Sequence, residues 1–417
     1  MQTVQENQTN NKVACMSASR LTKLLYNGFG IKSVIVKSIE FVGKEILVFT
    51  VRLKPNLKKC SKCCSKNVQI KESKTRRLKL IPLGKLSCFL DVLVYKFKCK
   101  DCGCSAWGKL PFAAGKLPMT LSFVEYTLSL VKIGTIQAIA TFLGIHWKTV
   151  RNIHKEYLQK KYTKINYKNL VYLSMDEFSI KKGHKYMTIF LDIRTGRIIY
   201  ACEGRSLESI EPFLQKLKKK ARKLEAIAMD LSPSYISSIK KILPQVAIVF
   251  DRFHVVKLLN EMLDTLRKSE RSRCKKEGLD IGKGDRFLLL HNFENLDEHK
   301  HYRLEKLLEI NTVLAVAYTM KEQFRIFWEK SSKKEAAEFL IAWVLSAITS
   351  YIPELEKMGY SMLRHKEGLL AYYDHPISNG KIEGVNNKIK VKKRQGYGYR
   401  DTGYFTLLLY DLHEKAA

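Results

Sequence analysis

The 417-residue sequence lacks any long apolar run. Its first twelve residues, MQTVQENQTNNK, are polar and have no apolar core, so we expect no secretory signal peptide. The most apolar segment, residues 339–352, is too short and too polar to span a bilayer. These features predict a soluble, cytoplasmic protein with no membrane partner.

Acidic residues are also scarce. The sequence has 40 Asp and Glu against 74 Lys and Arg, a net charge of +34, and its pI is about 9.7. Such an excess suits a polyanionic partner, above all nucleic acid, and predicts salt-sensitive association. The alternative is a lysine-rich solvated surface. The length predicts two to four domains, and 46% hydrophobic residues suffice for a core.

Ten cysteines in a cytoplasmic chain suggest metal ligands before disulfides. Two CxxC pairs have the spacing of a tetrahedral zinc site and comprise Cys60, Cys63, Cys99 and Cys102. Cys64 and Cys104 offer other registers, but Gly103 suits the turn that follows a zinc knuckle. The alternative is a metal-free set of buried thiols. The other cysteines lack partner spacing and are interpreted as small hydrophobic residues: Cys15, Cys88, Cys202 and Cys274.

The N-terminal region combines strands with a helical pair. Residues 31–53 predict a hairpin broken at Gly43, and residues 77–83 and 87–97 predict two strands joined near Gly84. Residues 121–157 have helical periodicity.

Within residues 121–157, the turn at Gly144 gives the layout of a helix-turn-helix. Lys148, Arg151 and Asn152 would then face DNA. Trp147 fits either the core or a contact, and we interpret it as core.

The region that follows changes to strand periodicity. Residues 171–178, VYLSMDEF, alternate apolar and polar positions and place Asp176 at the end of a buried strand. Two further strands and a helix precede residues 226–230, a short apolar strand that ends on Asp230. A short helix and a fifth strand ending on Asp251 follow, with His254 three residues later. This order is typical of an RNase H-like domain, an α/β fold with a mixed five-stranded sheet.

Residues 258–375 have helical patterns throughout and predict an all-α insertion, in which Trp328 and Trp343 are interpreted as core. After it, Glu383 falls on a helix, and a second apolar helix is predicted for residues 404–413. The residues that share the helical face of Glu383 are Asn387, Lys390 and Arg394.

Three carboxylates converging from two strands and a helix can bind two hard cations and cleave a phosphodiester, so Asp176, Asp230 and Glu383 are the candidate catalytic and Mg²⁺-binding residues. Alternatives stay open. Asp176 and Asp230 fit turn or cap positions, Glu177 fits the role of the true ligand, and Glu383 fits an exposed helix surface. Asp251 and His254 fit a structural pair or an auxiliary role.

The assembled motifs are SMDEFSIKKGHKYMTIFLDIRTG, AMDLSPSY, VFDRFHVVK and SNGKIEGVNNKIKVKKRQGYGYRD. With them the chain resembles the ISL3 family of insertion-sequence transposases of the DDE type. The resemblance implies a transposase that binds the terminal inverted repeats and target sites in double-stranded DNA. It implies Mg²⁺ or Mn²⁺ at the acids, Zn²⁺ at the cysteines and a homodimer or larger synaptic complex in a prokaryotic, nucleoid-associated setting. A catalytically inactive DNA-binding regulator and an RNase H-like nuclease are the alternatives.

The expected domains follow this order along the chain. They are a disordered N-terminus (1–20), a zinc-ribbon domain (21–112), a helix-turn-helix domain (113–165), the first part of an RNase H-like domain (166–257), the helical insertion (258–375) and the C-terminal part of the RNase H-like domain (376–417).

Overall fold

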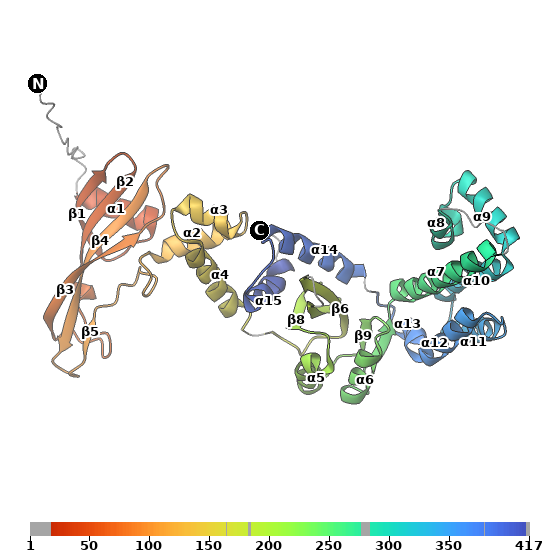
Figure 1. Ribbon diagram of the computed structural model, residues 1–417. Helices are drawn as coiled ribbons and strands as arrows, with labels where there is room; N and C mark the ends of the chain where they lie inside the picture. Colours follow the sequence, from red (N-terminus) through yellow and green to blue (C-terminus); the bar gives the residue numbers. More distant parts are fainter. Residues whose placement is uncertain (1–17, 164, 182–184, 277–283, 379, 414–417) are drawn as a thin grey trace, which may run out of the picture. The chain divides into compact units, whose positions relative to one another are not determined.

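A computed structural model describes residues 18–163, 165–181, 185–276, 284–378 and 380–413 (Figure 1). The chain divides into two compact units, Met1–Tyr157 and Leu158–Lys415. Of the N-terminus expected to be disordered (1–20), residues 1–17 lie outside the described residues, and so does Cys15. No helix among the described residues has the length and apolar character needed to cross a bilayer.

The first unit contains helix α1 (Ala18–Phe29) and a five-stranded sheet of order β1-β2-β4-β3, with β5 paired to β4. The strands are β1 (Val34–Val42), β2 (Ile46–Leu53), β3 (Val68–Lys79), β4 (Ser87–Cys99) and β5 (Ser105–Trp107). The predicted β1–β2 hairpin is confirmed, with Gly43 at a φ of +64°. The start predicted for β3, residue 77, was wrong by nine residues. Its first half is polar and exposed, so it has no apolar alternation to detect.

Three helices follow: α2 (Leu121–Val131), α3 (Ile136–Leu143) and α4 (Trp147–Lys161). Thr120 and Thr135 cap α2 and α3 by accepting hydrogen bonds from the amides of Phe123 and Ala138. Gly144 ends α3 in the left-handed conformation, with a φ of +57°. The predicted helix, glycine turn and helix are therefore present.

The second unit is built on a sheet of order β10-β9-β6-β7-β8. Strands β6 (Tyr172–Lys181), β7 (Lys185–Asp192) and β8 (Ile198–Glu203) are antiparallel. Strands β9 (Ala226–Met229) and β10 (Ala247–Phe250) run parallel to β6. The expected three antiparallel strands followed by two more are confirmed. Asp176, however, lies within β6 and not at its end, because β6 continues as a hairpin with β7 after its pairing with β9 stops at Ser174.

Helices cover both faces of this sheet (Figure 1). Helices α5 (Leu207–Lys220) and α6 (Pro233–Ile242) bury residues such as Phe213 and Tyr235 on the face that carries Leu173 and Met175. Helices α14 (Gly380–Gln395) and α15 (Thr402–Tyr410) cover the opposite face, where Ile382, Val385 and Ile389 pack with Ile189 and Phe405. The prediction that the C-terminal helix packs back on the sheet is confirmed. This packing brings α14, which carries Glu383, to the strand that carries Asp176.

The segment between β10 and α14 is helical, as predicted. It contains α7 (Arg252–Lys276), α8 (Asp285–Leu290), α9 (Glu298–Ile310), α10 (Thr312–Phe324), α11 (Lys333–Ile348), α12 (Pro353–Arg364) and α13 (Lys366–Asp374). Trp328 and Trp343 are buried in it, which confirms their interpretation as core. Gly368 lets α13 approach β10 closely, since a Cβ there would lie 2.3 Å from the ring of Phe250.

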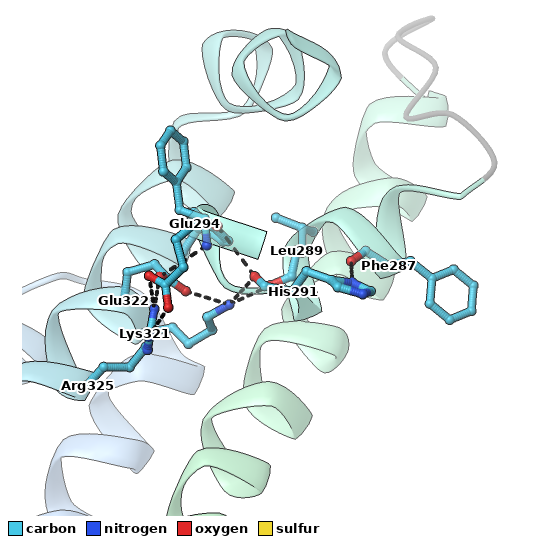
Figure 2. Close-up of polar contacts among 9 residues, drawn as sticks. Phe287, Leu289, His291, Glu294, Lys321, Glu322 and Arg325 are labelled. Carbon is cyan, nitrogen blue, oxygen red and sulfur yellow. Dashed lines mark hydrogen bonds and ion pairs between the residues drawn. The ribbon is translucent and has the colours of Figure 1, made fainter. Parts of the chain in front are cut away.

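A buried lysine fixes the end of α8 (Figure 2). Lys321 is 2% exposed, and its ammonium donates to the carbonyl oxygens of Leu289 at 3.0 Å and His291 at 2.9 Å. It also pairs with Glu322 at 2.9 Å, which in turn pairs with Arg325. Burial lowers the pKa of Lys321. The ammonium thus satisfies carbonyl groups that a helix terminus leaves without intrahelical partners.

Candidate active site and metal centre

The four predicted zinc ligands lie together at one end of the first unit's sheet. Val68, at the start of β3, pairs with Cys99, at the end of β4, so the turns before β3 and after β4 are adjacent. The Sγ atoms of Cys60, Cys63, Cys99 and Cys102 all lie within 4.8 Å of one another. The Cys60–Cys102 distance is 3.7 Å and the Cys63–Cys99 distance is 3.5 Å.

These distances fit a tetrahedral metal site. Thiolates about 2.3 Å from a central zinc ion lie about 3.8 Å from each other, whereas a disulfide needs about 2.05 Å. The amides of Cys63 and Lys62 point to the sulfur of Cys60 and lower its pKa to about 6, which favours the thiolate that binds metal. Gly103 turns the chain after Cys102 with a φ of +67°. Cys64 and Cys104 lie outside this group.

In the second unit, the register of three strands places three aspartates on one rung, with Asp230 and Asp251 one residue beyond the ends of β9 and β10. Strands β6 and β9 are paired as far as Ser174 and Ala228, and the same register continued by two residues places Asp176 beside Asp230, whose charge acts on it. Strands β9 and β10 are paired as far as Met229 and Phe250, so Asp251 lies on the other side of Asp230. Neighbouring strands are about 4.8 Å apart. The parallel strands therefore bring three carboxylates from distant parts of the chain to the same region of the sheet.

Asp176 is held by a side chain from α14. The Nδ2 atom of Asn386 donates to Asp176 Oδ2 at 2.5 Å, and the amide of Glu177 donates to Oδ1 at 2.7 Å. Burial raises the pKa of Asp176, these two hydrogen bonds oppose the rise, and the charge of Asp230 adds to it. The Oδ1 atom of Asn386 is buried and has no hydrogen-bond partner among the described residues. A buried carbonyl oxygen beside a carboxylate is suited to a hard divalent cation.

Asp251, on this rung, pairs with His254. Asp251 is 8% exposed, and its Oδ2 lies 3.0 Å from His254 Nδ1. This hydrogen bond raises the pKa of His254, burial opposes the rise, and the charges of Asp251, Asp230 and Asp176 add to it. A protonated His254 thus offsets the negative charge of the three aspartates. Asp230 Oδ1 also accepts from the amide of Ser232 at 3.2 Å, so the turn role considered for Asp230 is present as well.

Glu383 lies in the first turn of α14 and is exposed. It precedes Asn386 by three residues, which places both on the same side of the helix. Among the described residues, its carboxylate does not join Asp176 and Asp230 in a group of ligand atoms within 4.8 Å. The structure therefore places Asp176, Asp230 and Asp251 on neighbouring strands and Glu383 one helical turn from the contact to Asp176, but among the described residues no three of these carboxylates lie within 4.8 Å of one another.

Asn386 is the functional candidate that the sequence reasoning missed. The predicted face of α14 contained Asn387, Lys390 and Arg394, all of which are exposed. Asn386, at the half-buried edge of the helix, makes the contact to Asp176. The available signal was its spacing of three residues from Glu383 and its place beside Val385 on the buried side.

Glu177 lies on the other face of the sheet from Asp176, because successive side chains of a strand alternate. Burial raises its pKa, and a hydrogen bond with Tyr235 on α6 opposes the rise. The hydroxyl group of Tyr235 also lies 3.1 Å from that of Thr188. Glu177 thus belongs to a polar network on the α5–α6 face.

The helical pair of the first unit exposes polar side chains on α4. Lys148 and Asn152 are exposed and Arg151 is half-buried. The interpretation of Trp147 as core was wrong: its side chain is 39% exposed. Trp147 stacks on His146 at 5.7 Å, and the cations of Lys148 and Arg151 lie 5.9 and 5.6 Å from its ring centre. At the first position of α4, the indole points away from the core that Val150 and Ile153 enter.

Comparisons with known proteins give one consistent result. The model of the ISL3 transposase family (DDE_Tnp_ISL3) matches residues 173–409. The transposase for insertion sequence element IS1001 of Bordetella parapertussis is 30% identical over 388 residues, covering 92% of this chain and 94% of the relative. The transposase for insertion sequence element IS1557 of Mycobacterium tuberculosis is 25% identical over 403 residues, covering 88% of this chain and 90% of the relative.

Among solved structures, the Drosophila P element transposase strand transfer complex matches with a TM-score of 0.36 and 10% identity, covering 74% of this chain and 95% of that one. The family match spans the strands and helices that carry the three aspartates, Asn386 and Glu383. Its 237 residues, with the 30% identity over nearly the whole chain, establish the family. This chain belongs to the ISL3 family of DDE transposases, enzymes of DNA transposition.

Proposed function

We propose that the chain cleaves and joins DNA strands at the ends of its insertion sequence with Asp176, Asp230 and Glu383 as catalytic acids of an RNase H-like domain. The observation that supports this most is the shared rung of Asp176 and Asp230, with Asn386 linking α14 to Asp176. Glu383 lies one helical turn before Asn386 on the same side of α14. The sheet order, with β6 central and the helical segment inserted before α14, is the arrangement expected of such a domain.

The acids and the buried oxygen of Asn386 fit Mg²⁺ or Mn²⁺, which prefer oxygen ligands. When bound, such ions activate the attacking hydroxyl and stabilise the leaving oxygen of a phosphodiester. The chain's own part is to hold the carboxylates at fixed separation on parallel strands. We assign Asp251 and His254 an auxiliary role, in which the imidazolium offsets the charge of the aspartates until the cations enter.

We assign the first unit to recognition of the terminal inverted repeats. The cysteine cluster fits Zn²⁺ in a ribbon, and α4 would enter the major groove with Lys148, Arg151 and Asn152. The exposed Asn387, Lys390 and Arg394 on α14 would contact DNA near the catalytic acids. Lys393 is less available, because its ammonium donates to the carbonyl oxygen of Ser179 at 2.8 Å. The domain boundaries expected above and a homodimeric or larger synaptic complex belong to this proposal.

The test is a cleavage assay on duplexes that carry the ends of the element, with and without Mg²⁺. We expect Asp176→Ala, Asp230→Ala and Glu383→Ala each to reduce cleavage by about a thousandfold, which corresponds to losing several kcal/mol of transition-state stabilisation. DNA binding should persist. The matched control is Glu177→Gln, which alters the adjacent carboxylate on the other face and should retain most activity. Full cleavage by all three alanine variants would refute the assignment, and Mg²⁺-independent binding without cleavage by the intact chain would favour an inactive regulator.

A further inference from the structure

Tyr397 is an exposed aromatic residue held in an unusual backbone conformation. Its side chain is 101% exposed, and its φ is +47°. This left-handed region is uncommon for residues other than glycine, asparagine and aspartate. A fully exposed ring gains nothing from packing within this chain. The fold therefore gives no reason for a tyrosine at this position.

The turn that carries Tyr397 is well defined. The amide of Tyr397 donates to the carbonyl of Arg394 at 3.0 Å, and the amide of Gly398 donates to that of Lys393 at 3.0 Å. These two bonds are the Schellman motif that ends many helices, and Tyr397 occupies the position that usually takes glycine. A Cβ on Gly396 would lie 2.6 Å from the ring of Tyr399, which itself stacks on Phe405 at 4.9 Å. The ring is thus projected from an anchored turn.

The surroundings of this ring are cationic. Arg394 and Arg400 are exposed on either side of it in sequence, and Lys388 and Lys390 are exposed on the preceding turns of α14. Aromatic rings set among cations are the feature by which proteins hold single-stranded or unpaired nucleotides.

Tyr351 provides an internal comparison. It has the same backbone conformation, with a φ of +56°, and its side chain is 90% exposed. The residues after it place Glu354 and Glu356 in the first turn of α12. Exposure and backbone conformation alone therefore do not indicate a DNA contact. The charge around the ring separates the two tyrosines.

We propose that Tyr397 stacks on an unpaired nucleobase at the DNA end, while Arg394 and Arg400 contact the adjoining phosphates. The inference rests on the proposed function, because DNA must reach α14 for the ring to meet a base. Tyr397 lies in the turn that ends the helix carrying Glu383, so a base held there would fix the strand relative to the acids. Its role is to position the DNA, and it takes no part in the chemistry.

The experiment uses the full chain and a duplex bearing the element's end with a three-nucleotide single-stranded overhang. 2-Aminopurine is placed at successive positions across the overhang and the adjoining base pairs. We expect its fluorescence to be quenched at one position by the wild type and by Tyr397→Phe, and to be unquenched with Tyr397→Ala. We expect Tyr397→Ala to bind the overhang duplex about 5- to 150-fold more weakly, the range that stacking of one base supplies. Tyr351→Ala should behave as the wild type.

Tyr397→Gly separates stacking from folding. It suits the left-handed position and should melt no lower than the wild type, yet it should lose the quenching. If Tyr397→Ala and Tyr397→Gly retain wild-type quenching and affinity while the wild type binds and cleaves, the stacking role is overturned and the proposed function stands. If the wild type neither binds nor cleaves the DNA end, the proposed function fails and this inference fails with it.

Discussion

The cysteine cluster and the aspartate rung are both candidate metal sites, but the chain assembles them differently. The four sulfur atoms lie within 4.8 Å of one another, at two turns brought together by a single antiparallel pair, β3 and β4. The acids come from three parallel strands and a helix that follows the helical insertion. Asp176, Asp230 and Asp251 share a rung, whereas Glu383 stands apart on the first turn of α14.

The difference fits the roles proposed for the two sites. A structural zinc site needs four ligands in a closed shell, and a hairpin can supply them from its own turns. A site that takes up cations together with a DNA phosphate needs open positions and ligands that can adjust. Asn386 fits this second kind of site, because it connects α14 to Asp176 while its buried Oδ1 has no hydrogen-bond partner among the described residues.

The largest effect should come from substitutions in the cysteine cluster. We expect Cys60→Ser or Cys99→Ser to lose the bound zinc, about one ion per chain in the wild type, because structural zinc supplies about 10–16 kcal/mol to small zinc modules. Limited proteolysis should then cut between residues 55 and 107. Zinc analysis and proteolysis measure this, and Cys64→Ser and Cys104→Ser are the matched controls. Equal zinc loss in the controls would contradict the ligand set.

A smaller effect is expected at Asn386, which links α14 to Asp176. Asn386→Ala removes the hydrogen bond to Asp176 and the unpaired oxygen, and such supporting groups contribute about 10–100-fold to metal affinity or activity. We therefore expect the Mg²⁺ concentration for half-maximal cleavage to rise by about this factor. Asn387→Ala, one residue away and exposed, should change DNA binding and leave the Mg²⁺ dependence alone. An unchanged Mg²⁺ dependence in Asn386→Ala would leave Asn386 with a packing role only.

The same contrast explains which features of the two sites the sequence predicts. Asp176, Asp230 and Asp251 could be predicted from short apolar strands that end near an acid, because strand period and position are local properties of the sequence. The cysteine pairs were visible from their spacing. The common rung of the three aspartates could not be predicted, because it depends on the register of β6, β9 and β10, and register is fixed by packing across the sheet.

Two side chains show the limit most clearly. Trp147 was assigned to the core because tryptophan is usually buried, yet at the start of α4 it lies outside the apolar stripe. A helical face counted from Glu383 in steps of three to four residues includes Asn386 as readily as Asn387. The choice between these adjacent positions depends on the rotation of α14 about its axis. Ile382, Val385 and Ile389 set that rotation by packing on the sheet.

The smallest effect concerns the proton on His254. Its hydrogen bond to Asp251 raises its pKa in the folded state, so the pair contributes stability that is complete below the ordinary histidine pKa of about 6.5 and is lost as the pH rises through the higher folded value. We expect the wild type to exceed His254→Gln in free energy of unfolding by about 1 kcal/mol or less at pH 5.5, as for other partly exposed pairs, and the difference to vanish by pH 9. Denaturant titrations at both pH values without added Mg²⁺ measure it. A difference that grows with pH would mean that His254 is neutral beside the aspartates. The three aspartates would then lack the cation that offsets their charge before metal binds.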